Sequence, residues 1–334
     1  MHTNEWNKSI RASTAMVLLL VLLLTLATAP QSLAKESPGD DRHGPDNFHF
    51  AVIGDNSGGS RDGVLAAGVD ALNLLRPEFV LGVGDLIEGY TDDEAELKRQ
   101  WQTMDAVIGR LAMPFFYVPG NHDVNFAPSE QLWFNRADAE RSYTHFTYED
   151  VLFLLISTED PPKQEVSEEL EEKYALLKQG KISGEEGLAV IAELEAWAGA
   201  INISDAQVDY FKKVLADNPD VRWTFLFMHS PAWMQEDPGN FAQIESLLAD
   251  RPYTVFAGHT HAYDYTVRNG RDYITMATTG GLSPAGGSTG NMDHVAWVTM
   301  TSDEPVIGNL ILNGILGKQG ATPALQDFLL YRPR

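Results

Sequence analysis

The fold of this chain is constrained most by short apolar segments, each followed directly by side chains of the types that bind metals. Three of them, each of a length typical of a buried strand, occupy residues 48–53, 79–83 and 114–118. Helical spacing over 64–75 and about 93–109 predicts helices between them. Strands that alternate with helices are mostly parallel, and ligands bind at the carboxyl ends of such strands. We therefore expect the polar residues after the strands to meet at one edge of a sheet.

The rest of the chain continues this alternation and then becomes rich in strands. Further apolar runs predict strands at residues 151–156, 223–228, 253–257, 273–278, 294–301 and 306–312. Residues 162–200 are rich in Glu, Lys, Leu and Ala with helical periodicity, which indicates a helical insertion on the surface. The expected fold class is α/β, with one domain over residues 48–334 whose carboxyl-terminal portion is β-rich.

The strand ends supply side chains of the types that bind divalent metals. The candidate ligands are Asp55, Asp85, Asn121, His229, His259 and His261. Metals of intermediate hardness favour imidazole and carboxylate ligands, and a two-metal site needs a carboxylate that bridges ions about 3.5–4 Å apart. Two such metals would polarise a phosphoryl oxygen and convert a bound water to a hydroxide nucleophile near neutral pH. His122, beside them, would then donate a proton to the leaving oxygen.

The order of these residues resembles the pattern of the calcineurin-like metallophosphoesterase family. The motifs that carry the resemblance are Gly84-Asp85, Gly120-Asn121-His122-Asp123, His229 and Gly258-His259-Thr260-His261. The resemblance extends over about residues 48–270, the bulk of the domain. It implies a two-sheet β-sandwich flanked by helices, two bound metals and hydrolysis of phosphate esters.

The same resemblance implies a role for each candidate. One metal would be held by Asp55, Asp85 and His261. The other would be held by Asp85, Asn121, His229 and His259, with Asp85 as the bridge. His122 would be the general acid or a phosphate contact. Glu88 stands where the family usually has Asp, and it is expected to orient His122.

One position departs from the family pattern. The first motif of the family usually reads Asp-x-His, whereas this chain has Asp55-Asn56-Ser57. A serine hydroxyl is a poor neutral ligand, so the first metal site loses an imidazole. We expect two divalent ions, of the Mn, Fe or Zn type, with the first held more weakly than the second.

Charge and cysteine content narrow the class of protein. The formal net charge of −23 argues against a protein that grips nucleic-acid backbones, and a small phosphorylated substrate is the expected partner. The chain has no cysteine, which excludes disulfides, thiolate zinc sites and a cysteine nucleophile. The expected function is hydrolysis of phosphate esters by a metal-activated hydroxide. The alternatives are a catalytically weakened binding or regulatory protein on the same fold, and a nuclease.

The amino terminus has the layout of a cleavable signal peptide. Lys8 and Arg11 precede an apolar run over 15–26, and small residues flank Leu33 at 32–34. Residues 1–34 are therefore expected to direct export to the periplasm or the medium, without stable membrane insertion once they are cleaved. The alternative is an uncleaved membrane anchor. Residues 35–47 are expected to form a flexible leader.

Several histidines and aromatic residues, and one aspartate, are expected to have no catalytic role although their side-chain types occur in active sites. The histidines without neighbouring candidate ligands are His43, His49, His145 and His294. Asp123 is expected to shape the turn after His122. Core or rim packing is the favoured role for Trp133, Trp233 and Tyr263.

Overall fold

The computed structural model describes residues 47–125, 127–162, 167–282 and 292–312. The expected signal peptide, and the expected leader up to residue 46, lie outside these residues. Within the part that the structure describes, no helix combines the length and the apolar composition that crossing a bilayer requires.

The first sheet has five strands and contains the amino-terminal half of the predicted alternation. Its order is β11 (Pro305–Ile311), β10 (His294–Met300), β1 (Phe48–Ile53), β2 (Phe79–Gly82), β3 (Phe115–Tyr117). β1, β2 and β3 are parallel, with Phe50 beside Phe79 and Val80 beside Phe115. β10 runs antiparallel to β1. Because the three parallel strands point the same way, the residues that follow them emerge at one edge, as predicted.

The second sheet has six strands. Its order is β4 (Thr144–Tyr148), β5 (Val151–Leu155), β6 (Trp223–Phe227), β7 (Tyr253–Ala257), β9 (Arg271–Thr275), β8 (Asp264–Arg268). The four central strands are parallel, and β4 and β8 are antiparallel edge strands. β5, β6 and β7 are mainly apolar because both of their faces are buried.

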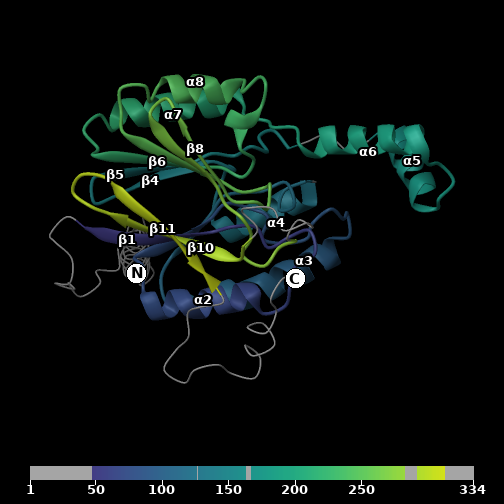
Figure 1. Cartoon of the computed structure of the whole chain (residues 1–334), viewed down its shortest axis with the longest axis horizontal. Helices are drawn as coiled ribbons and strands as arrows, with labels where there is room; N and C mark the ends of the chain where they lie inside the picture. The colour runs from purple at the N-terminus through teal and green to yellow at the C-terminus, as the bar shows by residue number, and fades with distance from the viewer. Residues whose placement is uncertain (1–46, 126, 163–166, 283–291, 313–334) are drawn as a thin grey trace, which may run out of the picture. The chain divides into compact units, whose positions relative to one another are not determined.

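The two sheets pack face to face through an aromatic core. Phe50 of β1 meets Phe153 of β5 and Phe225 of β6 edge-on, with ring centroids 5.3 and 4.9 Å apart. The outer face of the first sheet is covered by α2 (Val64–Leu75), α3 (Glu94–Ile108) and α4 (Ala127–Ala137). The outer face of the second is covered by α7 (Asp205–Asp217) and α8 (Asn240–Ser246) (Figure 1). The predicted two-sheet sandwich flanked by helices is confirmed.

The predicted insertion is also confirmed as helical. Its helices are α5 (Glu168–Lys178) and α6 (Gly184–Ala198), which pack against each other (Figure 1). The sequence pattern missed α4, α8, β4 and β8. The strands among them lie at sheet edges and bury few side chains, so they lack a clear apolar alternation.

Candidate metal centre

The carboxyl ends of strands from both sheets meet at one place, and the six candidate ligands all lie there. Asp55 follows β1, Asp85 follows β2 and Asn121 follows β3. The second sheet contributes His229 after β6, together with His259 and His261 after β7. The face-to-face packing of the sheets therefore joins loops that are up to about two hundred residues apart in sequence.

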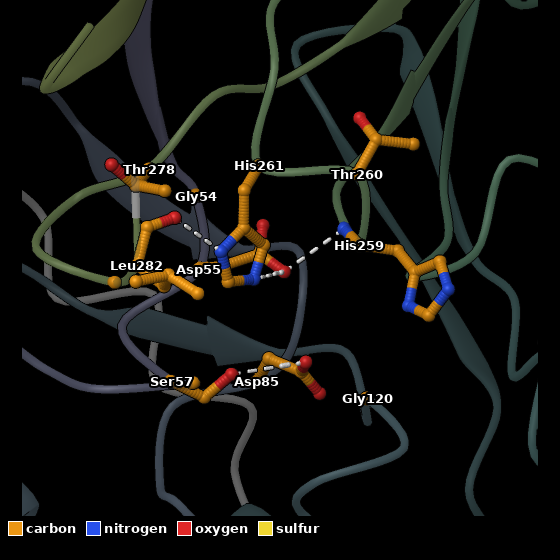
Figure 2. Close-up of polar contacts among 12 residues, drawn as sticks. Gly54, Asp55, Ser57, Asp85, Gly120, His259, Thr260, His261, Thr278 and Leu282 are labelled. Carbon is orange, nitrogen blue, oxygen red and sulfur yellow. Dashed lines mark hydrogen bonds and ion pairs between the residues drawn. The ribbon is translucent and has the colours of Figure 1, made fainter. Parts of the chain in front are cut away.

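Two groups of side chains present atoms suited to hold a cation, and the groups share one residue. Asp55, Asp85 and His261 form one group, and Asp85, His229 and His259 form the other. In each group the candidate ligand atoms lie within 4.8 Å of one another. In Figure 2 the ring of His261 faces the carboxylate of Asp55, and the carboxylate of Asp85 lies nearby. This grouping matches the division that the sequence resemblance implied.

Asp55 is fully buried, and its carboxylate is only partly satisfied by the described protein atoms. Oδ1 accepts the backbone N–H of His259 at 2.9 Å and lies 3.6 Å from Nε2 of His261. Oδ2 has no hydrogen-bond partner in the described part of the chain. Burial raises the pKa of Asp55 to about 6. A buried carboxylate oxygen without a partner is costly for a protein alone, and a cation would satisfy it.

Asp85 is also buried but stays ionised. Its Oδ1 accepts the backbone N–H of His122 at 2.9 Å and lies 3.3 Å from Nε2 of His229. Its Oδ2 accepts the hydroxyl of Ser57 at 3.1 Å. Burial opposes ionisation, but the positive charges of His229 and His122 and their hydrogen bonds hold the pKa of Asp85 well below its usual range. A carboxylate kept charged between the two groups has the position and charge that a bridging ligand needs.

The second group is completed by the side-chain oxygen of Asn121. His229 is fully buried and donates its Nδ1–H to the carbonyl of Val83 at 2.9 Å, which leaves Nε2 facing the group. Asn121 Oδ1 lies 2.9 Å from that Nε2 and 3.0 Å from Nδ1 of His259. Burial acts to lower the pKa of His229. The negative charges of Asp85 and Asp55 outweigh this effect and raise the pKa to about 10. Without a cation, a proton on His229 therefore supplies the positive charge of this group.

His261 is oriented in the same way as His229. Its Nδ1 donates to the carbonyl of Leu282 at 2.6 Å, so Nε2 faces Asp55 (Figure 2). A backbone carbonyl that fixes one ring nitrogen is the usual support of a metal-binding histidine. Imidazole, carboxylate and amide donors around buried, partly unsatisfied oxygens fit divalent metal ions of the predicted type.

Glu88 contacts His122 through its backbone, while its carboxylate binds elsewhere. The backbone carbonyl of Glu88 accepts Nδ1–H of His122 at 2.5 Å. The carboxylate instead accepts the backbone N–H groups of Gly58, Gly59 and Ser60 at 2.8–3.2 Å. Three converging N–H groups offer this carboxylate more hydrogen bonds than one imidazole would. Glu88 thus orients His122 through its main chain and holds the 58–60 loop through its side chain. A catalytic role for Glu88 stays a prediction.

Ser57, at the position where the family has a histidine, is fully buried and donates its hydroxyl to Asp85. The hydroxyl lies beside the first group (Figure 2) and supports the shared carboxylate. The place of the missing imidazole is therefore occupied by a hydrogen-bond donor to the bridge candidate.

Asp123 ties two ligand loops together, which confirms its predicted structural role. Its carboxylate accepts the backbone N–H groups of Asp85 at 2.8 Å, Leu86 at 2.9 Å and Gly120 at 3.0 Å. Burial, reinforced by the charge of Asp85, raises the pKa of Asp123 to about 7.

The glycines of the motifs are required by close approach to the ligands. A Cβ on Gly120 would lie 2.2 Å from Oδ1 of Asp85, and one on Gly258 would lie 2.6 Å from Oδ2 of Asp55. Any side chain at these positions would occupy the space beside the carboxylates.

Sequence reasoning missed Tyr90. Its hydroxyl accepts the amide N–H of Asn121 at 2.8 Å, which turns the amide oxygen of Asn121 toward His229 and His259. Its ring also packs edge-on against His122, with centroids 4.6 Å apart. No sequence signal identified it, because Tyr90 lies in a loop several residues after β2 rather than at the strand end.

The residues predicted to lie outside the site do so where the structure describes them. His49 contacts Thr299, His145 contacts Tyr210, and His294 is a buried hydrogen-bonded histidine. Trp133 and Trp233 are core residues, and Tyr263 packs against the ring of His294. His43 lies outside the described residues.

Comparison with known proteins gives one family and several similar folds. The family described as calcineurin-like phosphoesterase matches residues 48–263. A dimetal phosphatase from Danio rerio has a similar structure, with a TM-score of 0.56 and 18% identity over 79% of this chain and 96% of that one. A purple acid phosphatase from yellow lupin has a TM-score of 0.51 and 14% identity over 83% of this chain and 53% of that one. No curated protein sequence matches this chain significantly.

Proposed function

Since this chain belongs to the calcineurin-like phosphoesterase family, we propose that it is an enzyme that hydrolyses phosphate esters with divalent metal ions. One observation carries the proposal. Two groups of candidate ligands share the ionised carboxylate of Asp85, and a buried oxygen of Asp55 beside them lacks a protein partner within the described residues. Such a pair of groups is suited to two ions held side by side.

The first ion would be held by Asp55, Asp85 and His261. The second would be held by Asp85, Asn121, His229 and His259. Bound divalent ions supply Lewis-acid catalysis, since they polarise a phosphoryl oxygen and make a nearby water more acidic. The protein holds these side chains in place through the carbonyls of Val83 and Leu282 and the hydroxyl of Tyr90.

The proton donor to the leaving group that we propose is His122. Its Nδ1–H is engaged by the carbonyl of Glu88, so its Nε2, 3.8 Å from Oδ2 of Asp85, faces the site. The side chain is 21% exposed, which leaves this nitrogen accessible to a substrate. As the oxygen of water attacks phosphorus and the bond to the leaving oxygen breaks, the proton on Nε2 passes to that oxygen, and the proton released by the attacking water returns the ring to its protonated form.

The substrate we propose is a small phosphorylated molecule. The acidity of the chain, with a formal net charge of −23, disfavours a long nucleic-acid substrate.

The test is metal removal and return. Protein treated with excess chelator is assayed with an aryl phosphomonoester and an aryl phosphodiester, before and after addition of Mn²⁺, Fe²⁺ or Zn²⁺. We expect activity to vanish on chelation and to return best with Mn²⁺, because the donors are oxygen and nitrogen without sulfur. Full activity after long exposure to chelator contradicts the proposal. Two tightly bound ions without turnover of either ester class would instead favour the binding or regulatory alternative.

A further inference from the structure

The structure contains an aromatic surface beside the proposed proton donor. It consists of Tyr90, in the loop after β2, and Trp197, on insertion helix α6; we call the pair the aromatic wall. Their ring centroids lie 5.9 Å apart at an interplanar angle of 61°. Tyr90 meets the ring of His122 edge-on at 4.6 Å, so the wall begins at the proposed catalytic residue.

Tyr90 is held firmly against the site. Gly89, just before it, has a φ of 56°, and a Cβ there would lie 1.8 Å from the carbonyl oxygen of His122. The N–H of Gly89 is bound by the side chain of Gln100 at 2.9 Å. The hydroxyl of Tyr90 is bound by Asn121. The position of the ring relative to His122 is therefore fixed by backbone contact on one side and by a hydrogen bond on the other.

Both side chains of the wall are partly exposed. Tyr90 is 37% exposed, and Trp197 is half-buried. Neither aromatic side chain is part of the three apolar cores of the domain. Exposed aromatic surface next to a group of charged side chains is suited to a molecule with one charged end and one apolar end.

The charges of the site determine how such a molecule would lie. Under the proposed function, the phosphoryl group belongs at the two metal-ligand groups and the leaving oxygen belongs near Nε2 of His122. The organic part of the leaving group then extends past His122, where Tyr90 and Trp197 border it. Aromatic side chains bind flat rings by stacking and bind saturated groups of the same size less well.

From this arrangement we propose that the aromatic wall binds the leaving group, and that the substrates are phosphate esters of molecules with a planar aromatic ring. The inference rests on the proposed function. It also assigns a role to the insertion, since α6 supplies Trp197 as the outer half of the wall.

A binding experiment tests this without relying on turnover. Phenylphosphonate, cyclohexylphosphonate and methylphosphonate are titrated into the full chain loaded with Mn²⁺, by calorimetry. We expect phenylphosphonate to bind about tenfold more tightly than methylphosphonate, at the lower end of what stacking on one aromatic side chain contributes. It should also bind more tightly than cyclohexylphosphonate, which has similar size but no flat ring. Equal affinity for the phenyl and cyclohexyl compounds overturns the assignment of an aromatic leaving group.

Variants at two positions of α6 locate the effect. Trp197→Ala should remove most of the preference for phenyl over methyl, and so should Trp197→Leu, which keeps apolar volume at this position. Leu188→Ala, at a residue 67% exposed on α6, should keep the preference and serves as the matched control. Metal content and circular dichroism of each variant report whether it is folded. Retention of the full preference in both folded Trp197 variants overturns the proposal.

These experiments distinguish failure of the proposed enzymatic function from failure of the aromatic-wall proposal. If the protein hydrolyses aryl and alkyl phosphate esters but binds all three phosphonates equally, only the aromatic wall is wrong. If no ester is hydrolysed under any metal while the phenyl preference is present and depends on Trp197, only the enzymatic function is wrong.

Discussion

At the scale of single residues, Asp85 links the two ligand groups of the site. It belongs to both ligand groups, and its oxygens meet Ser57, His122 and His229. We expect Asp85→Asn to lose both bound ions and at least 99% of activity, because a neutral amide bridges cations poorly. Metal analysis and phosphomonoester turnover measure this. Asp92→Asn, at an exposed position in the following loop, is the control and should retain both. Two ions retained in Asp85→Asn would show that the bridge lies elsewhere.

His122 should behave differently from the ligands. His122→Ala keeps the backbone N–H that binds Asp85, so the metal content should stay nearly constant. Turnover should fall by about 10²–10⁴-fold, the usual range for loss of a general acid. The fall should be smaller for esters whose leaving group has a low pKa, since these need less protonation. A series of aryl and alkyl phosphates measures the trend, and an equal fall across the series would assign His122 to phosphate positioning instead.

Ser57 sets an expected difference between the two metal sites. The first group has one imidazole, from His261, whereas the second has two, from His229 and His259. Because imidazole favours transition metals, the first ion should bind at least about tenfold more weakly. Titration of stripped protein with Mn²⁺ should therefore give two separate steps. Ser57→His should bring the steps together if the buried loop accepts the ring. Two equally tight sites in the unaltered protein contradict the expectation.

At the scale of elements, a neutral histidine at the start of β10 joins this strand to its neighbours by hydrogen bonds. His294 is fully buried; its Nε2 accepts the N–H of Ala277 at 3.0 Å, and its Nδ1–H donates to Asn309 on β11 at 2.9 Å. Burial lowers the pKa of His294 to about 4. The neutral ring is therefore favoured in the folded state, and protonation favours unfolding.

The pH dependence of stability follows from this difference. The unfolded chain takes up the proton near pH 6.5 and the folded chain only near pH 4, so the contribution of His294 is complete above pH 6.5, decreases as the pH falls from 6.5 and is fully lost below about 4. Between pH 7.5 and pH 5 the free energy of unfolding should drop by about 2 kcal/mol more in the parent protein than in His294→Gln, whose amide does not titrate. Urea unfolding at several pH values measures this. Parallel pH profiles would show that His294 is not kept neutral.

At the scale of the whole molecule, we propose that the chain is exported and acts outside the cytoplasm. Basic residues, an apolar run and small residues at positions 32 and 34 predict cleavage after Ala34. Expression of the full chain in a bacterial host should yield periplasmic or secreted protein whose first residue is Lys35. Mass spectrometry of the cell fractions measures this, and a Leu20→Arg change in the apolar run should retain the uncleaved chain in the cytoplasm. Uncleaved parent protein in the membrane fraction would favour the anchor.

The sequence by itself determined the strands of the core and the types of ligand at their ends. Buried parallel strands require continuous apolar runs, and these runs stop where the chain enters a polar loop, so Asp55, Asp85 and His229 were identifiable from pattern alone. The grouping of the ligands and the role of His122 came from resemblance to a family, because spacing along the chain does not measure distance in space.

Only the tertiary structure decided where the other side chains point. The carboxylate of Glu88 turns to the 58–60 loop, the hydroxyl of Tyr90 turns to Asn121, and Trp197 comes beside Tyr90 from more than a hundred residues away. The loops that carry these side chains include residues with positive φ, such as Asp85 and Tyr90. Such conformations are stabilised by contacts across the fold rather than by local sequence, which is why no periodicity or composition could have predicted them.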